Sequence, residues 1–223
     1  MVDENDSFIR EVNEELRSDQ LKSVWKRFGR LVIALAVLVV VGTVAHRGYV
    51  YWREDSASQS GDQFLAALKL SDEGKQDEAI AALAQLEKEG HGAYPVLARL
   101  RTATAQAEKG ETQAAIDGFT AVGADTKVPS VLRDVARMRA GWLLIDAGTY
   151  EQVSAQVEVL TVPASSLRHS AREALGLAAY KAGDMAKARG WFTQITEDAE
   201  APRNVTNRAQ MMLDNIAATG KAP

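Results

Sequence analysis

Four glycines recur at nearly equal intervals along this 223-residue chain, and their spacing limits the possible fold more than any other feature. They are Gly74, Gly110, Gly148 and Gly183, and each stands between two stretches rich in helix-forming residues. Glycine readily adopts the left-handed conformation that ends an α-helix and turns the chain back. The spacing therefore predicts four helical hairpins of similar length, each with a left-handed glycine at its turn.

The positions around each glycine repeat as well. A small residue stands seven positions before it, an alanine or valine five after it, and bulky apolar residues nine and twelve after it. Unit by unit, these residues are Ala67, Ala79, Leu83 and Leu86; Ala103, Ala115, Phe119 and Val122; Gly141, Val153, Val157 and Leu160; and Gly176, Ala188, Phe192 and Ile195. Small residues let paired helices approach closely, and bulky residues fill the space to the next hairpin. Since no single hairpin buries its apolar face, the units are predicted to stack.

A charge-free apolar segment precedes the repeats. It covers residues 31–45, and a helix needs about 20 apolar residues to cross a membrane. Adding residues 49–51 gives that length if His46 and Arg47 extend toward the lipid headgroups. We predict an uncleaved transmembrane helix over residues 30–53. The alternatives are a buried core helix of a soluble protein and a cleaved signal peptide.

Basic residues are unevenly distributed around this segment. Five precede it closely, whereas only Arg47 and Arg53 follow it closely; the five are Arg17, Lys22, Lys26, Arg27 and Arg30. Such a bias places the N-terminus in the cytoplasm. Residues 1–29 are then a cytoplasmic helical segment, which either lies on the inner leaflet or docks a cytoplasmic partner. The C-terminal domain is expected outside, in the periplasm if the membrane is a bacterial inner membrane.

The composition gives no support for catalysis. The net charge of −4 has the wrong sign for a nucleic-acid-binding surface. The absence of cysteine excludes disulfides, thiol catalysis and cysteine-ligated metals. The three histidines, His46, His91 and His169, are far apart in the sequence and are predicted to be surface or interfacial residues. We expect no catalytic residue, no metal and no cofactor, and a protein that is not an enzyme.

The repeat pattern resembles the tetratricopeptide repeat over about residues 61–198. The predicted fold is all-α: a single N-terminal transmembrane helix is followed by a tetratricopeptide-like solenoid of four helical hairpins. The solenoid covers residues 54–202, and residues 203–223 form a C-terminal capping helix and tail. Met211, Met212 and Ile216 are expected on the inner side of that last helix.

Trp142, Ile145 and Tyr180 are the candidate partner-binding residues. They lie on first helices of their hairpins, three or six residues before the glycine, and the resemblance implies that such positions face the concave groove. Exposed aromatic residues in a groove suit an extended or helical peptide. The alternative is that all three are core residues of a tightly closed superhelix.

The whole-chain arrangement resembles the YfgM-like family of ancillary subunits of the bacterial Sec translocon. Local similarity lies in three segments, which are residues 94–100, 172–191 and 211–216. The resemblance implies a non-enzymatic inner-membrane protein that associates with the SecYEG channel and with a membrane-anchored periplasmic chaperone of the prolyl-isomerase-like type. Such a protein helps pass secreted chains to periplasmic chaperones. The alternative is a tetratricopeptide scaffold for another envelope assembly pathway.

Overall fold

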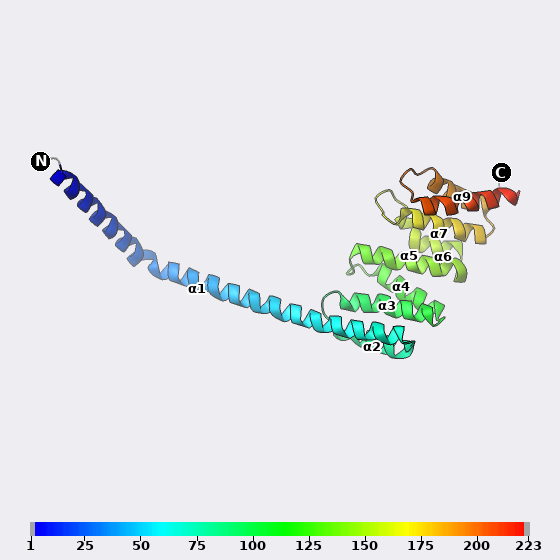
Figure 1. Ribbon diagram of the computed structural model, residues 1–223, viewed down its shortest axis with the longest axis horizontal. Coiled ribbons are helices and arrows are strands. Elements are labelled where there is room, and N and C mark those ends of the chain that lie inside the picture. Colours follow the sequence, from blue (N-terminus) through cyan, green and yellow to red (C-terminus); the bar gives the residue numbers. More distant parts are fainter. Residues whose placement is uncertain (1–2, 221–223) are drawn as a thin grey trace. The chain divides into compact units, whose positions relative to one another are not determined.

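The computed structural model describes the backbone of residues 3–220 and the side chains of residues 25–220. This part of the chain contains helices and turns and no β-strand. The chain divides into two compact units, residues 1–55 and residues 56–223 (Figure 1). A single helix, α1 (Asp3–Asp72), begins in the first unit and ends in the second.

The first unit contains the apolar segment of α1. Every side chain from Arg30 to Tyr49 is exposed, so this segment is not a core helix of the chain itself. The stretch is long and apolar enough to cross a membrane, by length and composition alone, and a signal sequence passes the same test. The hydroxyl of Thr43 donates a hydrogen bond to the Val39 carbonyl at 2.7 Å, which satisfies the polar group within the helix.

The second unit begins with the C-terminal end of α1 and continues through a row of shorter helices (Figure 1). These are α2 (Gln76–Glu89), α3 (Tyr94–Glu108), α4 (Thr112–Ala124), α5 (Ser130–Ala147), α6 (Tyr150–Val157) with the 3-10 turn η1 (Glu158–Leu160), α7 (Arg168–Lys181), α8 (Met185–Thr196) and α9 (Arg203–Ala218). Successive helices pair as antiparallel hairpins: α3 with α4, α5 with α6, and α7 with α8. In the first hairpin, Ala67 of α1 packs with Leu83 and Leu86 of α2. The last helix, α9, packs against α7 and α8.

The repeated apolar positions form the core of this row. The alanine, valine and bulky residues predicted at the second helices are all buried, with Leu83, Val157 and Phe192 fully so. The small residues are needed for close approach. A Cβ atom on Gly141 would lie 2.4 Å from Val157, and one on Gly176 would lie 2.7 Å from the Phe192 ring. These distances confirm that small residues set the separation within a hairpin.

Three of the four predicted left-handed glycines are confirmed. Gly74, Gly110 and Gly183 have φ angles of 78°, 83° and 80°. At each of these turns the next residue donates its backbone N–H to a carbonyl five residues back, as the Schellman motif requires. The Glu111 N–H, for example, donates to the Gln106 carbonyl at 2.9 Å.

The prediction for Gly148 is wrong. Its backbone is extended, with φ −123° and ψ −163°, and α6 begins only two residues later. The turn is closed by a capping box, in which Thr149 accepts from the Gln152 backbone while the Gln152 side chain accepts from the Thr149 N–H. This reciprocal cap starts the second helix without a left-handed residue.

One expectation for the last helix is also wrong. Ile216 is buried and Met212 is half-buried, but Met211 is 62% exposed. The inner stripe of α9 contains Val205, Ala209, Met212 and Ile216, at intervals of four, three and four residues. Met211 lies about 100° around the helix from Met212 and therefore faces solvent.

Alanine substitutions at two glycines test turn geometry and helix propensity separately. The Gly183→Ala variant should lose about 1 kcal/mol of stability because alanine resists the left-handed conformation, although no atom would clash with the new methyl group. The Gly190→Ala variant, in the open interior of α8, should gain roughly 0.5–1 kcal/mol. Thermal unfolding of the purified chain, followed by circular dichroism, checks both. Shifts in the same direction would contradict this assignment.

Candidate interaction surface

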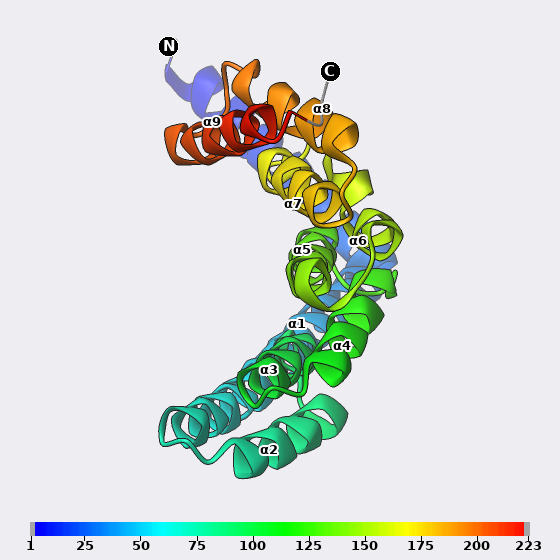
Figure 2. The same cartoon turned by 90° about the vertical axis from the view of Figure 1, so that its right-hand side faces the viewer.

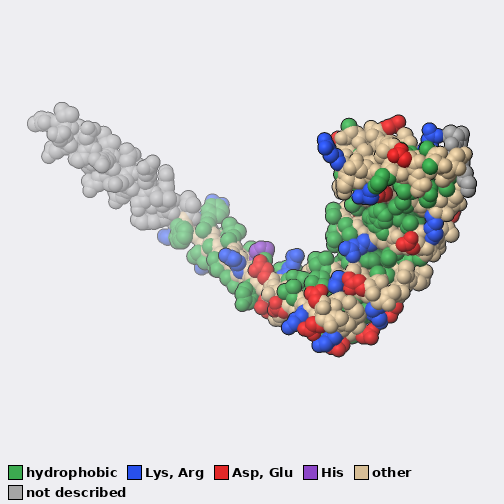
Figure 3. Space-filling view, turned by 45° about the vertical axis from the view of Figure 1, so that its right-hand side comes forward, with side chains coloured by type: hydrophobic (Ala, Val, Ile, Leu, Met, Phe, Trp, Pro, Cys, Tyr) green, Lys and Arg blue, Asp and Glu red, His purple; other side chains and the backbone are tan. Residues whose placement is uncertain are grey.

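The first helices of the hairpins lie along one side of residues 56–223. Figure 2 shows α3, α5, α7 and α9 on the inner side of a curved row, with α2, α4, α6 and α8 on the outer side. The inner helices contact one another, α5 with α7 and α7 with α9. In Figure 3 hydrophobic side chains gather on the hollow side, with Lys and Arg side chains among them. This inner side is a concave, mainly apolar surface.

Trp142 is the most exposed of the three candidate residues. It lies on α5 with 38% of its surface accessible, and among the described side chains it belongs to no buried hydrophobic cluster. Arg139, Trp142 and Ile145 follow one another at intervals of three residues, so they share a face of α5. A tryptophan in this position offers a large apolar surface to a partner.

Ile145 is half-buried and lines a cavity between α5, α6 and α7. The cavity has a volume of about 270 Å³, and its lining includes Leu144, Tyr150, Ala178 and Lys181. The ammonium group of Lys181 donates hydrogen bonds to the Ile145 carbonyl at 2.8 Å and the Asp146 carbonyl at 2.6 Å. These carbonyls are at the C-terminal end of α5, where a positive charge is favoured by the helix dipole.

Tyr180 lies next to this lysine on α7. Its ring is half-buried and packs against the hydrophobic cluster that α7, α8 and α9 form around Phe192. Ile145 packs instead against the cluster that centres on α5, α6 and α7. The structure therefore brings Ile145 close to Lys181, and it gives Ile145 and Tyr180 a packing role in addition to their place on the inner helices.

Basic side chains connect successive first helices, a feature that sequence reasoning missed. Arg101 of α3 donates to Ser71 of α1 at 2.9 Å, and Arg139 of α5 donates to Thr104 of α3 at 3.0 Å. Lys181 joins α7 to α5 as described, and α9 is joined to α7 by an ion pair between Arg208 and Glu173. A signal existed, because Arg101 and Arg139 both stand nine residues before a turn glycine.

The ion pair between α9 and α7 is bidentate. The Nε and Nη2 atoms of Arg208 donate to the two carboxylate oxygens of Glu173 at 2.6 and 2.8 Å. The Glu173 side chain is only 6% exposed, so the pair satisfies a buried charge. Hydrogen bonding to Glu173 raises the pKa of the Arg208 guanidinium above its ordinary value, so it stays charged.

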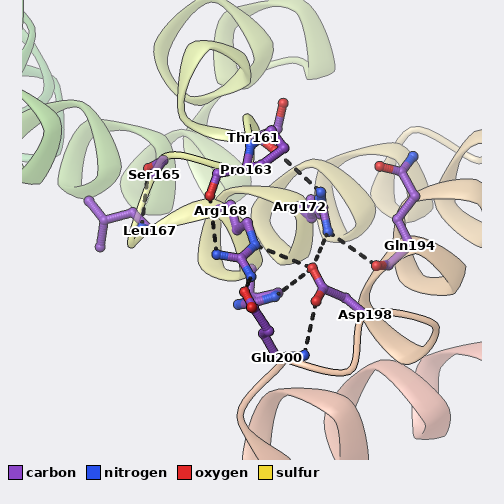
Figure 4. A network of polar contacts seen from close by, with 10 residues as sticks. Thr161, Pro163, Ser165, Leu167, Arg168, Arg172, Gln194, Asp198 and Glu200 are labelled. Atoms are coloured by element: carbon purple, nitrogen blue, oxygen red, sulfur yellow. Dashed lines mark hydrogen bonds and ion pairs between the residues drawn. The ribbon is translucent and has the colours of Figure 1, made fainter.

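A second polar network holds α7 to the turn between α8 and α9 (Figure 4). Asp198 accepts hydrogen bonds from Arg168 at 3.2 Å, Arg172 at 3.1 Å and the backbone N–H of Glu200 at 3.0 Å. The ring Nε2 atom of His169 lies 3.0 Å from the same carboxylate. The hydrogen bond from Arg168, with those from Glu200 and His169, holds the pKa of Asp198 well below its usual range.

The environment of His169 differs from the expected one. Its side chain is 8% exposed and contacts Asp198, so the prediction of a surface histidine is wrong for this residue. His46 and His91 are exposed as predicted. The Asp198 network joins α7 to α8 and to the neighbouring turns through charge pairs and hydrogen bonds to backbone carbonyls, which is a structural role. Within residues 25–220, no group of three His, Asp or Glu side chains is placed to hold a metal ion.

A stack of helical hairpins with a concave inner side is the architecture of a helical repeat scaffold. Comparison with known protein families matches residues 22–218 to the tetratricopeptide repeat-like domain. The chain therefore belongs to this tetratricopeptide repeat-like family, whose domains mediate protein–protein interactions. The match includes the apolar segment of α1 as well as the repeats. No curated protein matches the chain significantly.

The Asp198 network predicts a pH-dependent difference in stability. A carboxyl group whose pKa is lowered by folding stabilises the folded state above its unfolded pKa of 3.8, and this stabilisation is lost as the pH falls further. Replacing Asp198 with Asn should lower the unfolding midpoint at neutral pH, and the difference from wild type should shrink below about pH 4.

The matched control is Asp62→Asn, since Asp62 is exposed on α1 and makes no ion pair among the described residues. Its unfolding midpoint should follow wild type at every pH. Melting curves between pH 3 and pH 8 measure both variants. A constant deficit of the Asp198→Asn variant over the whole range would show that charge is not the cause.

Proposed function

We propose that this protein is a non-enzymatic adaptor of the bacterial inner membrane that associates with the Sec translocon. It helps pass secreted proteins to periplasmic chaperones, including a membrane-anchored chaperone of the prolyl-isomerase-like type. The repeat domain supports a scaffold role, since tetratricopeptide-like domains mediate protein–protein interactions. The resemblance of the whole chain to YfgM-like proteins supports the choice of partners.

One observation carries most of this proposal. The apolar segment and the first helix of the first hairpin are parts of one helix, α1. A helix that crosses the membrane over residues 30–53 continues directly into the repeat unit, which begins at residue 56. A repeat scaffold tethered this closely to a bilayer suits partners that are themselves in the membrane or emerge from it.

The distribution of charge supports the proposed topology. Lys26, Arg27 and Arg30 precede the apolar segment, and Tyr49 and Trp52, whose ring centroids lie 6.4 Å apart, follow it. Basic residues on the cytoplasmic side and aromatic residues at the interface are typical of a single-pass helix with its N-terminus in the cytoplasm. The repeat domain is then periplasmic. The alternative is a tetratricopeptide scaffold, in the same orientation, for another envelope assembly pathway.

The absence of cysteine makes the topology easy to test. Single cysteines at Ser18 and at the exposed Ser130 provide the only thiols. In intact spheroplasts, a membrane-impermeant maleimide should label the Ser130→Cys variant and should label the Ser18→Cys variant only after the membrane is opened. The opposite labelling pattern would contradict the proposed orientation.

The partners are tested by affinity purification from gently solubilised membranes. Translocon subunits and the membrane-anchored chaperone should copurify with the full chain. In a control chain, residues 30–53 are replaced by the transmembrane helix of an unrelated single-pass protein, which separates recruitment by the anchor from recruitment by the repeats. Recovery of subunits of a different envelope machinery, without the translocon, would favour the alternative.

A further inference from the structure

Two basic side chains on the inner side of the repeat unit have no carboxylate partner. Arg101 and Arg208, which also bridge first helices, are each close to a glutamate, at 3.5 Å and 2.6 Å. Arg139 and Lys181 are both exposed, and neither forms an ion pair within residues 25–220. The inner surface of α5 and α7 therefore carries two positive charges that the chain itself does not neutralise.

Both charges are held in place by neutral groups. The guanidinium of Arg139 donates to the Thr104 hydroxyl at 3.0 Å and lies 5.8 Å from the centre of the Phe119 ring. Lys181 donates to two backbone carbonyls at the end of α5, which occupies two of its three N–H groups. A cation that is already ordered loses little further entropy when it binds a carboxylate.

Trp142 and Ile145 lie between these two cations along α5. Arg139, Trp142 and Ile145 are three residues apart, and the Lys181 ammonium lies 2.8 Å from the Ile145 carbonyl. Six residues of helix rise about 9 Å. An extended chain covers the same distance in about three residues. Along α5 the order is therefore the cation of Arg139, the exposed Trp142, Ile145 at the cavity wall, and then the cation of Lys181, which comes from α7.

We propose that this row binds a partner segment in which an apolar side chain is flanked by two carboxylates about three or four residues apart. The apolar side chain packs on Trp142 and toward the cavity beside Ile145, and the carboxylates pair with Arg139 and Lys181. This inference deepens the proposed function and depends on the inner side of the repeat unit being its interaction surface. It concerns the binding preference of that surface, whichever membrane machinery the chain serves.

The test uses the full-length chain in detergent micelles and a fluorescein-labelled peptide of about twelve residues. This probe has two glutamates separated by phenylalanine and two leucines. One comparison peptide has lysines in place of the glutamates, and another has alanines in place of the apolar residues. Fluorescence anisotropy should show that the glutamate probe binds roughly tenfold more tightly than either comparison peptide, and that added salt weakens its binding.

Variants then locate the site. The Arg139→Glu and Trp142→Ala variants should each reduce affinity for the glutamate probe about tenfold. Because charge reversal removes the contact with Thr104, Arg139→Gln provides a second variant of similar length, and it should also lose affinity. The control is Lys88→Glu, which reverses an exposed basic residue on the outer helix α2 and should leave binding unchanged. Circular dichroism checks that each variant is folded.

Two results would overturn the inference. One is equal binding of the lysine and glutamate peptides, and the other is unchanged affinity in the folded Arg139→Gln variant. Self-association of the chain that disappears with Arg139→Glu would identify a second copy as the occupant and would equally overturn it. Copurification of the translocon in any of these cases would leave the proposed function standing, because recruitment would then use another surface.

Discussion

The close approach of the two helices in each hairpin is the constraint on which the repeat unit depends. At Gly141 and Gly176 the facing side chains, Val157 and Phe192, occupy the space in which a Cβ atom would lie. The partner residue is fully buried in both hairpins. Interiors of proteins are close-packed, so a larger residue at either glycine would separate the helices or displace the core side chain.

The packing within the hairpins determines which side chains remain exposed on the inner side of the repeat unit. Both helices of a hairpin contribute fully buried residues, such as Phe192 of α8 and Leu175 of α7, whereas Trp142 on the first helix α5 stays partly exposed. Bridges from Arg101, Arg139 and Lys181 connect these first helices to one another. The exposure of Trp142 belongs to an arrangement in which small residues set the separation within a hairpin and basic side chains connect successive first helices.

Periodic features of the sequence predicted the fold well. The spacing of glycines and the repeated small and bulky positions identified the hairpins and their core, because each feature acts within one or two helices. Gly148 and Met211 were predicted wrongly for local reasons. At Gly148 a Thr149–Gln152 capping box replaces the left-handed turn. Met211 stands one residue before the inner-stripe position of Met212 and is therefore exposed.

The candidate surface was less accessible to prediction. Trp142 could be found from its place in the repeat. The cations beside it could not be distinguished from basic residues that have a carboxylate partner, because such pairing depends on residues about 35 positions away. The contact of His169 with Asp198, 29 residues along the chain, was missed for the same reason. Single-sequence patterns describe helices and their faces, whereas charge pairing between hairpins requires the three-dimensional arrangement.

Site-specific photocrosslinking in intact membranes tests the central claim most directly, that this is a membrane-tethered scaffold whose inner side holds its partners. A photoreactive amino acid in place of Trp142 is compared with the same group in place of Lys88 on the outer side. The account predicts crosslinks to other envelope proteins from position 142 and few or none from position 88. Crosslinks of equal yield from both positions, or crosslinks from position 88 alone, would contradict it.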